Sequence, residues 1–290
     1  NGTINNFYEI TLATICINII LAVSLNLVTG FTGQFSLGHA GFMSIGAYVG
    51  ALINMEMNST LGFLVGILAG AVAAAIVGIL IGIPTLRLKG DYLAIATLGM
   101  AEIIRVVFLN MDDITNGAAG LNGIPRFTNW MWLFIFTALT IILISNFVRS
   151  SHGRACISIR EDEIAAESMG INTTMYKVMA FAIGAFFAGI GGALYSSYFY
   201  FIKPNIFGFM KSIDILVIVV FGGMGSITGS VIAAVVLAVL TTFLQSYSEL
   251  RMIIYALLLI IIMIFRPQGL MGTKEVTDLF KVGKKGEKIQ

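Results

Sequence analysis

The chain is organised around one polar segment between hydrophobic runs, Ser150-Ser-His-Gly-Arg-Ala-Cys-Ile-Ser-Ile-Arg-Glu-Asp-Glu-Ile-Ala-Ala-Glu-Ser-Met-Gly-Ile-Asn-Thr-Thr-Met-Tyr-Lys177. Ser158 and Glu161, three residues apart, form a capping box, and the acidic residues near the start favour the positive end of a helix dipole. Gly170 is a natural C-terminal stop. The segment therefore predicts a helix of about three turns, Ile159–Met169.

The predicted helix has a small apolar side. Ile164, Ala165, Ser168 and Met169 fall on one face at helical spacing. This face is too small for a core, but it suits a groove in another protein. We therefore expect a partner to act on the chain through this helix.

Composition indicates the class of protein. Hydrophobic residues make up 58% of the 290 residues and charged residues 11%, with a mean hydropathy of +0.94. These values are typical of a polytopic helical membrane protein. No signal peptide is visible, since hydrophobic runs continue to Phe265, and residues are expected before Asn1 because it is not a Met. Cys16 lies in a hydrophobic run and Cys156 in the polar segment, so a structural disulfide is not expected.

The hydrophobic runs predict an all-α fold of about eight to nine membrane elements, some of them short or broken. The runs are Phe7–Thr29, a shorter one to about Ile53, Leu61–Ile83, Tyr92–Leu109, Trp130–Val148, Val178–Phe201, Ile213–Phe221, one to about Leu244, and Met252–Phe265. Residues 1–270 are then a membrane domain, with its cytosolic helix at 158–170. Residues 271–290 form a basic cytosolic tail that we expect to be flexible.

Two glycine-rich breaks interrupt these runs, Gly30-Phe-Thr-Gly-Gln-Phe-Ser-Leu-Gly-His-Ala-Gly41 and Gly222-Gly-Met-Gly-Ser-Ile-Thr-Gly229. Irregular backbone at membrane depth must be surrounded by protein or by a wet cavity, so the breaks are candidates for the lining of a path. A long run precedes the first break and a short run follows it, whereas a short run precedes the second break and a long run follows it. This mirrored order suggests an internal inverted repeat. Neither break holds an Asp, Glu, Lys or Arg, which favours a neutral or zwitterionic substrate. The candidate path residues are Gln34, Ser36, His39, Gly222, Gly223 and Ser226.

His39 has two interpretations. It can titrate or bind a substrate, but a lone His near the end of a span is more often a structural hydrogen-bonding group. Ser36 and His39 lie three residues apart without an orienting acid or an oxyanion site. They do not form a catalytic pair, and we do not expect an enzyme.

Small residues recur at every fourth position in two runs, which allows helix backbones to approach closely. They are Gly62, Gly66, Gly70, Ala74, Gly78 and Gly82 in the first run, and Ala180, Gly184, Ala188, Gly192 and Ser196 in the second. Both helices are expected to be buried in a bundle.

Glu102 and Arg105 lie within one hydrophobic run, three residues apart. Charges at membrane depth favour a functional role, whereas a self-neutralising pair near the interface is the structural alternative. Both interpretations stay open.

The positive-inside rule sets the expected orientation. Most Lys and Arg fall in the loops at 84–91 and 149–177 and in the tail from 266, which places these segments in the cytosol, the N-terminus outside and the C-terminus inside. These cations are Arg87, Lys89, Arg149, Arg154, Arg160, Lys177, Arg266, Lys274, Lys281, Lys284, Lys285 and Lys288.

Four motifs carry a family resemblance that covers nearly the whole chain. They are Asn26-Leu-Val-Thr-Gly-Phe-Thr-Gly-Gln-Phe-Ser-Leu-Gly-His-Ala-Gly-Phe42, Gly90-Asp-Tyr-Leu-Ala-Ile-Ala-Thr-Leu-Gly99, Gly222-Gly-Met-Gly-Ser226 and Arg266-Pro-Gln-Gly-Leu270. The chain thus resembles the permease subunit of bacterial branched-chain amino acid ABC importers. The resemblance implies a multi-pass protein of the bacterial inner membrane. It also implies a second, related permease, two ATP-binding cassette subunits and an extracytoplasmic substrate-binding protein as partners.

The polar helix resembles the coupling segment of ABC permeases, Glu-Ala-Ala followed after three residues by Gly. Ala165, Ala166 and Gly170 match this pattern, whereas Ile164 stands where Glu is expected and Glu163 lies one place earlier. The chain has no Gly-x-x-x-x-Gly-Lys-Ser/Thr phosphate loop. ATP is therefore expected on partner subunits, with no cofactor on this chain and no nucleic-acid partner.

Other functions remain open at this stage. Urea and other amide or amino acid importers use similar permeases. A secondary transporter needs its own ion-coupling site, for which Glu102, Arg105 and Asp214 are a sparse set. A passive channel, like a secondary transporter, needs no helix for docking an ATPase.

Overall fold

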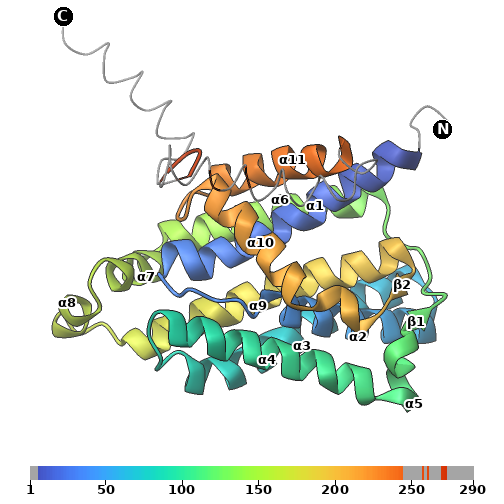
Figure 1. Cartoon of the computed structure of the whole chain (residues 1–290), viewed down its shortest axis with the longest axis horizontal. Helices are drawn as coiled ribbons and strands as arrows, with labels where there is room; N and C mark the ends of the chain where they lie inside the picture. The colour runs from blue at the N-terminus through green and yellow to red at the C-terminus, as the bar shows by residue number, and fades with distance from the viewer. Residues whose placement is uncertain (1–5, 244–256, 258–259, 261–268, 273–290) are drawn as a thin grey trace, which may run out of the picture.

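The computed structural model describes residues 6–243, 257, 260 and 269–272. Its helices form a bundle around a shared apolar core, shown in Figure 1. The elements are α1 (Asn6–Asn26), the π-helix η1 (Leu27–Phe31), α2 (His39–Met57), α3 (Thr60–Thr85), α4 (Asp91–Asn110), α5 (Asp112–Thr115), η2 (Gly117–Ala119), β1 (Leu121–Asn122), α6 (Trp130–Arg149), α7 (Ser151–Glu161), α8 (Glu163–Ser168), α9 (Thr173–Phe199), β2 (Phe201–Ile202), η3 (Pro204–Phe207), α10 (Phe209–Gly222) and α11 (Ile227–Phe243).

The prediction of an all-α, polytopic membrane protein is confirmed. Six helical stretches are long and apolar enough to cross a membrane: Tyr8–Phe31, Thr60–Thr85, Asp91–Asn110, Trp130–Arg149, Thr173–Phe199 and Pro204–Gly222. The 19-residue α2 and the 17-residue α11 add two further helices to the bundle. Most of the predicted run Met252–Phe265 and the tail from 273 lie outside the described residues.

The centre of the bundle is formed by α2, α3 and α9, which pack closely together. Glycines face one another across these contacts. A Cβ added to Gly70 would lie 2.8 Å from the carbonyl oxygen of Gly46, and one added to Gly192 would collide with the backbone of Met43. Both predicted small-residue stripes are buried, as expected for helices whose backbones approach closely.

The second break joins α10 and α11, which pack against each other. The prediction that the arm before this break is only half a span long is wrong. The 14-residue α10 begins at Phe209, and the 3-10 helix Pro204–Phe207 precedes it, so that together they are long enough to cross. Pro204 stands at the start of this 3-10 helix, where its fixed φ favours a helical beginning.

The polar segment 150–177 forms two short helices instead of one. The predicted capping box at Ser158 is wrong, because this residue lies inside α7 and its hydroxyl donates to the carbonyl of Ala155 (2.8 Å). Asp162 has an extended backbone and caps α8 instead, since its carboxylate accepts from the N–H groups of Ile164 (2.9 Å) and Ala165 (3.0 Å). Aspartate is as good an N-cap as serine.

The two ends of the bundle differ in structure. At one end, β1 pairs with β2, with Leu121 opposite Ile202, and α5 lies nearby. At the opposite end lie α7 and α8 (Figure 1). The long connector between α4 and α6 and the polar segment therefore lie on opposite sides of the molecule.

Candidate functional site

The two glycine-rich breaks, almost 200 residues apart in sequence, meet inside the bundle. Asn26 at the end of α1 joins them. Its Oδ1 accepts from the N–H of Gly225 (2.9 Å), and its Nδ2 donates to the carbonyl of Ser226 and to the hydroxyl of Ser230 (both 2.8 Å). Gly30 lies so close to Gly225 that a Cβ there would collide with the backbone. We call this contact between Asn26, Gly30 and the 223–230 turn the break junction.

Other elements hold the rest of the first break. The N–H of Leu37 donates to the hydroxyl of Thr97 on α4 (3.1 Å), and the N–H of Ala40 donates to Ser212 on α10 (3.4 Å). His39 is buried and its Nε2 lies 2.8 Å from the hydroxyl of Ser24. The irregular backbone is thus surrounded by protein, as membrane depth requires.

Every predicted path residue of the breaks is buried in this conformation. Ser36 is 2% exposed and accepts from the N–H of Gly38 (3.3 Å). Ser226 is fully buried and caps α11 by accepting from the N–H of Gly229 (3.0 Å). Gly222 packs against Gly229, and Gly223 has a φ of +115°, which favours glycine.

The end of a third resemblance motif, 266–270, and the residue that follows it bind next to the same turn. The N–H of Leu270 donates to the carbonyl of Phe221 (2.9 Å), and that of Met271 donates to the carbonyl of Gly222 (3.2 Å). Segments at residues 26–30, 221–230 and 269–271 therefore meet at one site.

Arg160 connects the helices at the end of the bundle to the first break. Its Nη1 donates to the carbonyl of Gly30 (2.9 Å), and its other guanidinium nitrogens bind Glu161. The breaks themselves carry no charge, but this cation from α7 reaches one of them. Arg160 therefore links α7 directly to the break junction.

Glu163 at the start of α8 binds two lysines. Its Oε1 lies 2.6 Å from the Nζ of Lys177 on α9, and its Oε2 lies 3.1 Å from the Nζ of Lys89 in the α3–α4 loop. Partial burial disfavours the charged carboxylate, but the hydrogen bonds and charges of the two lysines outweigh this effect and hold the pKa of Glu163 below its usual value. Glu163 is thus ionised at neutral pH and fixes α8 to two other elements.

Two large apolar side chains, one on α8 and one at its C-cap, are exposed beside the polar Glu167 and Ser168. Ile164 is 74% exposed and Met169 is 82% exposed, whereas Ala166 is buried against the bundle. The helix ends at Gly170, whose φ is +84°. The N–H of Gly170 donates to Glu167 and that of Ile171 donates to Ala166, the pattern of a Schellman motif.

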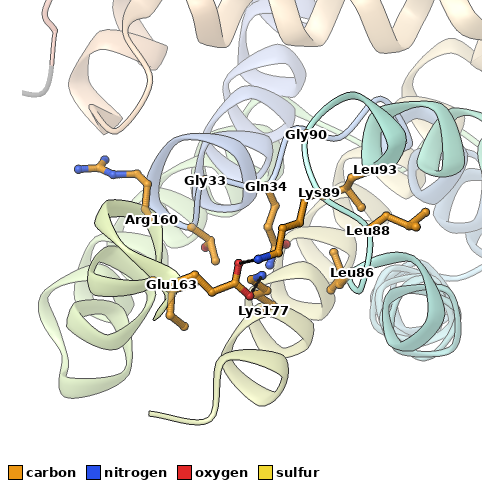
Figure 2. Close-up of a pocket in the computed structure, with 12 residues that line it drawn as sticks. Gly33, Gln34, Leu86, Leu88, Lys89, Gly90, Leu93, Arg160, Glu163 and Lys177 are labelled. Atoms are coloured by element: carbon orange, nitrogen blue, oxygen red, sulfur yellow. Dashed lines mark hydrogen bonds and ion pairs between the residues drawn. The ribbon is translucent and has the colours of Figure 1, made fainter. Parts of the chain in front are cut away.

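A cavity of about 230 Å³ lies between the first break, the α3–α4 loop and the α7–α8 pair. Figure 2 shows its polar side, where the side chains of Gln34, Lys89, Glu163 and Lys177 converge. Gln34 thus lines this cavity, away from the other predicted path residues.

Glu102 and Arg105 pair with each other on α4. The Nε of Arg105 lies 2.6 Å from Oε2 of Glu102, and its Nη1 donates to Oδ1 of Asn205 in η3 (3.1 Å). Both side chains are partly exposed. Asn205 is a partner that the sequence did not indicate, since it lies 100 residues away.

Sequence reasoning did not single out three residues that the structure brings to the site. Asn26 was only part of a motif, Arg160 was only a charge in a loop, and Lys177 was only an orientation signal. A polar side chain one turn before a glycine-rich break was a usable signal for Asn26. For Arg160 and Lys177, the sequence does not reveal which distant groups they meet.

The fold and the site place the chain in the class of polytopic membrane transport subunits. The family model described as "Branched-chain amino acid transport system / permease component" matches residues 7–263. The chain belongs to this family, whose members are transport permeases and not enzymes.

Curated relatives agree with the family. The high-affinity branched-chain amino acid transport system permease protein LivM of Salmonella typhimurium is 38% identical, over 93% of this chain and 72% of the relative. LivM of Escherichia coli is 36% identical over the same shares. The permease protein LivH of Salmonella typhimurium is 29% identical over 63% of this chain and 64% of the relative. No solved structure matches the chain.

Proposed function

We propose that the chain is the membrane permease of an ATP-driven importer for branched-chain amino acids or related small neutral amino acids. The names of its relatives, LivM and LivH, support this substrate class. The chain is similar to both of these permeases, which supports a second, related permease as its partner. Two ATP-binding cassette chains and an extracytoplasmic binding protein complete the proposed importer.

In this proposal α8 is the docking helix for an ATPase chain. The supporting observation is that α8 has exposed apolar side chains on one side and polar ties to the bundle on the other. Its apolar side chains Ile164 and Met169 face outward, while Glu163 and the neighbouring Arg160 tie it to Lys177, Lys89 and the carbonyl of Gly30. A force applied to α8 by an ATPase therefore has a short route to the break junction.

The proposed orientation follows from charge. The end of the bundle that carries α7 and α8 faces the cytosol, and the end with β1, β2 and α5 faces outward. The N-terminus is then outside and the C-terminus inside.

The proposed docking role is tested by Gly170→Val. At a φ of +84° a β-branched residue is strained by about 1–2 kcal/mol, although no atom lies within 4 Å of the added Cβ. We expect the Schellman motif to open, the ATPase chains to be lost on co-purification, and substrate-stimulated ATP hydrolysis to disappear.

Gly123→Val is the matched control. Gly123 has a φ of +76° and equally open surroundings, but it lies at the opposite end of the molecule. This variant should retain the ATPase chains. Normal co-purification and stimulated hydrolysis in Gly170→Val would remove α8 as the docking site.

A further inference from the structure

The cavity beside α8 has one polar wall with unused hydrogen-bonding capacity. Gln34 is 3% exposed, and neither its Nε2 nor its Oε1 has a hydrogen-bond partner among the described residues. A buried amide without partners is costly, so the site is built for a polar occupant. Figure 2 shows the Gln34 amide directed toward the space between the ammonium groups of Lys89 and Lys177.

The lysines of this wall can donate further hydrogen bonds. Each ammonium group has three donors. Lys177 is mostly buried and uses one donor for Glu163. Lys89 forms its ion pair with the same carboxylate. The carboxylate of Glu163 also has spare lone pairs for a donor from a ligand.

The lining also has apolar side chains. They are Leu86 and Leu88 from the end of α3 and the following loop, Leu93 from α4, and Ile159 from α7. A ligand that fits must therefore be small, carry both donors and acceptors at one end, and present an apolar group at the other.

We propose that this cavity binds one free amino acid with an apolar side chain, taken up from the cytosolic face. The α-carboxylate accepts from Lys177, Lys89 and the amide N–H of Gln34. The α-ammonium group donates to Glu163 and to the Oε1 of Gln34, and the side chain packs on the leucines and Ile159. This inference rests on the proposed orientation and substrate class, and it adds a site for the released product.

The charges of the cavity favour a zwitterion over a simple anion. Arg160 is already engaged by Glu161 and by the carbonyl of Gly30. The remaining charges of the lining are two lysines and one carboxylate. The two lysines attract the carboxylate of an amino acid, and Glu163 attracts its ammonium group, a group that a simple anion lacks.

The site also has a consequence for transport. Glu163 is the residue that fixes α8 to the α3–α4 loop and to α9. An amino acid that binds the same carboxylate and lysines alters the hold on α8, so accumulated product acts on the docking helix.

The test uses the assembled importer in inside-out membrane vesicles, without ATP or binding protein. Leu88→Cys places a reporter thiol on the cavity wall, in a background in which both native cysteines, Cys16 and Cys156, are replaced by alanine. An impermeant thiol reagent reports access. Leucine at ten times its dissociation constant should slow labelling about tenfold, because the empty fraction falls as 1/(1 + [L]/Kd).

Controls separate the possible ligands. Ser151→Cys, exposed at the start of α7 and outside the cavity lining, should label at the same rate with and without leucine. 4-Methylpentanoate lacks the ammonium group and 3-methylbutylamine lacks the carboxylate, so both should protect Leu88→Cys much less than leucine. Adding Gln34→Leu to Leu88→Cys should abolish the protection by leucine. If the importer with Gln34→Leu does not assemble, the comparison of the three ligands on Leu88→Cys tests the proposal by itself.

Unchanged labelling at saturating leucine would overturn the proposal, and so would equal protection by inorganic phosphate. Uptake of leucine by the same Leu88→Cys variant is measured in right-side-out vesicles that are loaded with ATP and supplied with the binding protein outside. Normal uptake without protection refutes the cavity site alone, whereas absent uptake of any branched-chain amino acid refutes the proposed function.

Discussion

Asn26 is the residue on which the break junction depends. Its amide is fully buried and makes three hydrogen bonds to Gly225, Ser226 and Ser230. A side chain must accept one hydrogen bond and donate two in order to bind an N–H, a carbonyl and a hydroxyl at once. The asparagine amide has this acceptor and these two donors.

Asn26→Leu should destabilise the folded protein and impair transport. The substitution leaves the buried N–H of Gly225 without its Asn26 partner, which costs about 1–3 kcal/mol. It also removes the bonds from the Asn26 amide to the carbonyl of Ser226 and the hydroxyl of Ser230. The melting temperature in detergent should fall and uptake should be lost. Asn110→Leu is the control, because Asn110 makes an exposed bond within its own helix, to the carbonyl of Val106. Equal melting temperatures for the two variants would show that Asn26 does not hold the breaks together.

At this scale the sequence predicts residue types better than partners. The glycines of both breaks were found because glycine runs inside apolar segments are rare and have few physical explanations. The partners of Asn26 lie about 200 residues away, and Arg160 meets Gly30 across 130 residues. Such contacts arise from tertiary packing, and no local pattern encodes them.

Among the elements, α2, α3 and α9 carry most of the close packing. In a membrane the lipid tails are as apolar as the side chains, so helices associate through close van der Waals contact between small residues. Gly192 on α9 lies directly against the backbone of Met43 on α2.

Gly192→Leu should force α9 away from α2. Overpacking of a dense core costs about 1–3 kcal/mol and more where backbone cannot yield, so the thermal stability in detergent should drop clearly. Gly99→Leu is the matched control, since Gly99 is an exposed helical glycine of α4 with no atom within 4 Å of an added Cβ. If both variants melt alike, the α9 stripe faces lipid.

The helices themselves were largely predictable, because their apolar lengths and four-residue small-side-chain repeats are strong local signals. The polar segment was mispredicted where two signals competed. Ser158 and Asp162 both suit an N-cap, but Ala155, Cys156 and Ile159 are buried on one face. That burial extends α7 through Ser158 and moves the helix start to Asp162.

At the scale of the whole molecule, we propose that the break junction gates the path and that α8 moves it. Glu163 fixes α8 to Lys89 and Lys177. Arg160, at the end of α7 that leads into α8, binds the carbonyl of Gly30, and Asn26 joins this first break to the second. Packed interfaces of this kind switch between discrete arrangements and do not deform gradually.

The most direct test is thiol access at the two breaks, with Ser36→Cys and Ser226→Cys made singly in a cysteine-free background. Both positions are buried in the present conformation, so a small water-soluble reagent should label them only after the breaks open. Ser196→Cys, in the packed core of α9, should stay inert, and Asn122→Cys, on the exposed β1, should always react. We predict that labelling at both breaks changes when nucleotide binds the assembled importer. Inert thiols at both breaks in every nucleotide state would contradict the account and make the breaks packing devices.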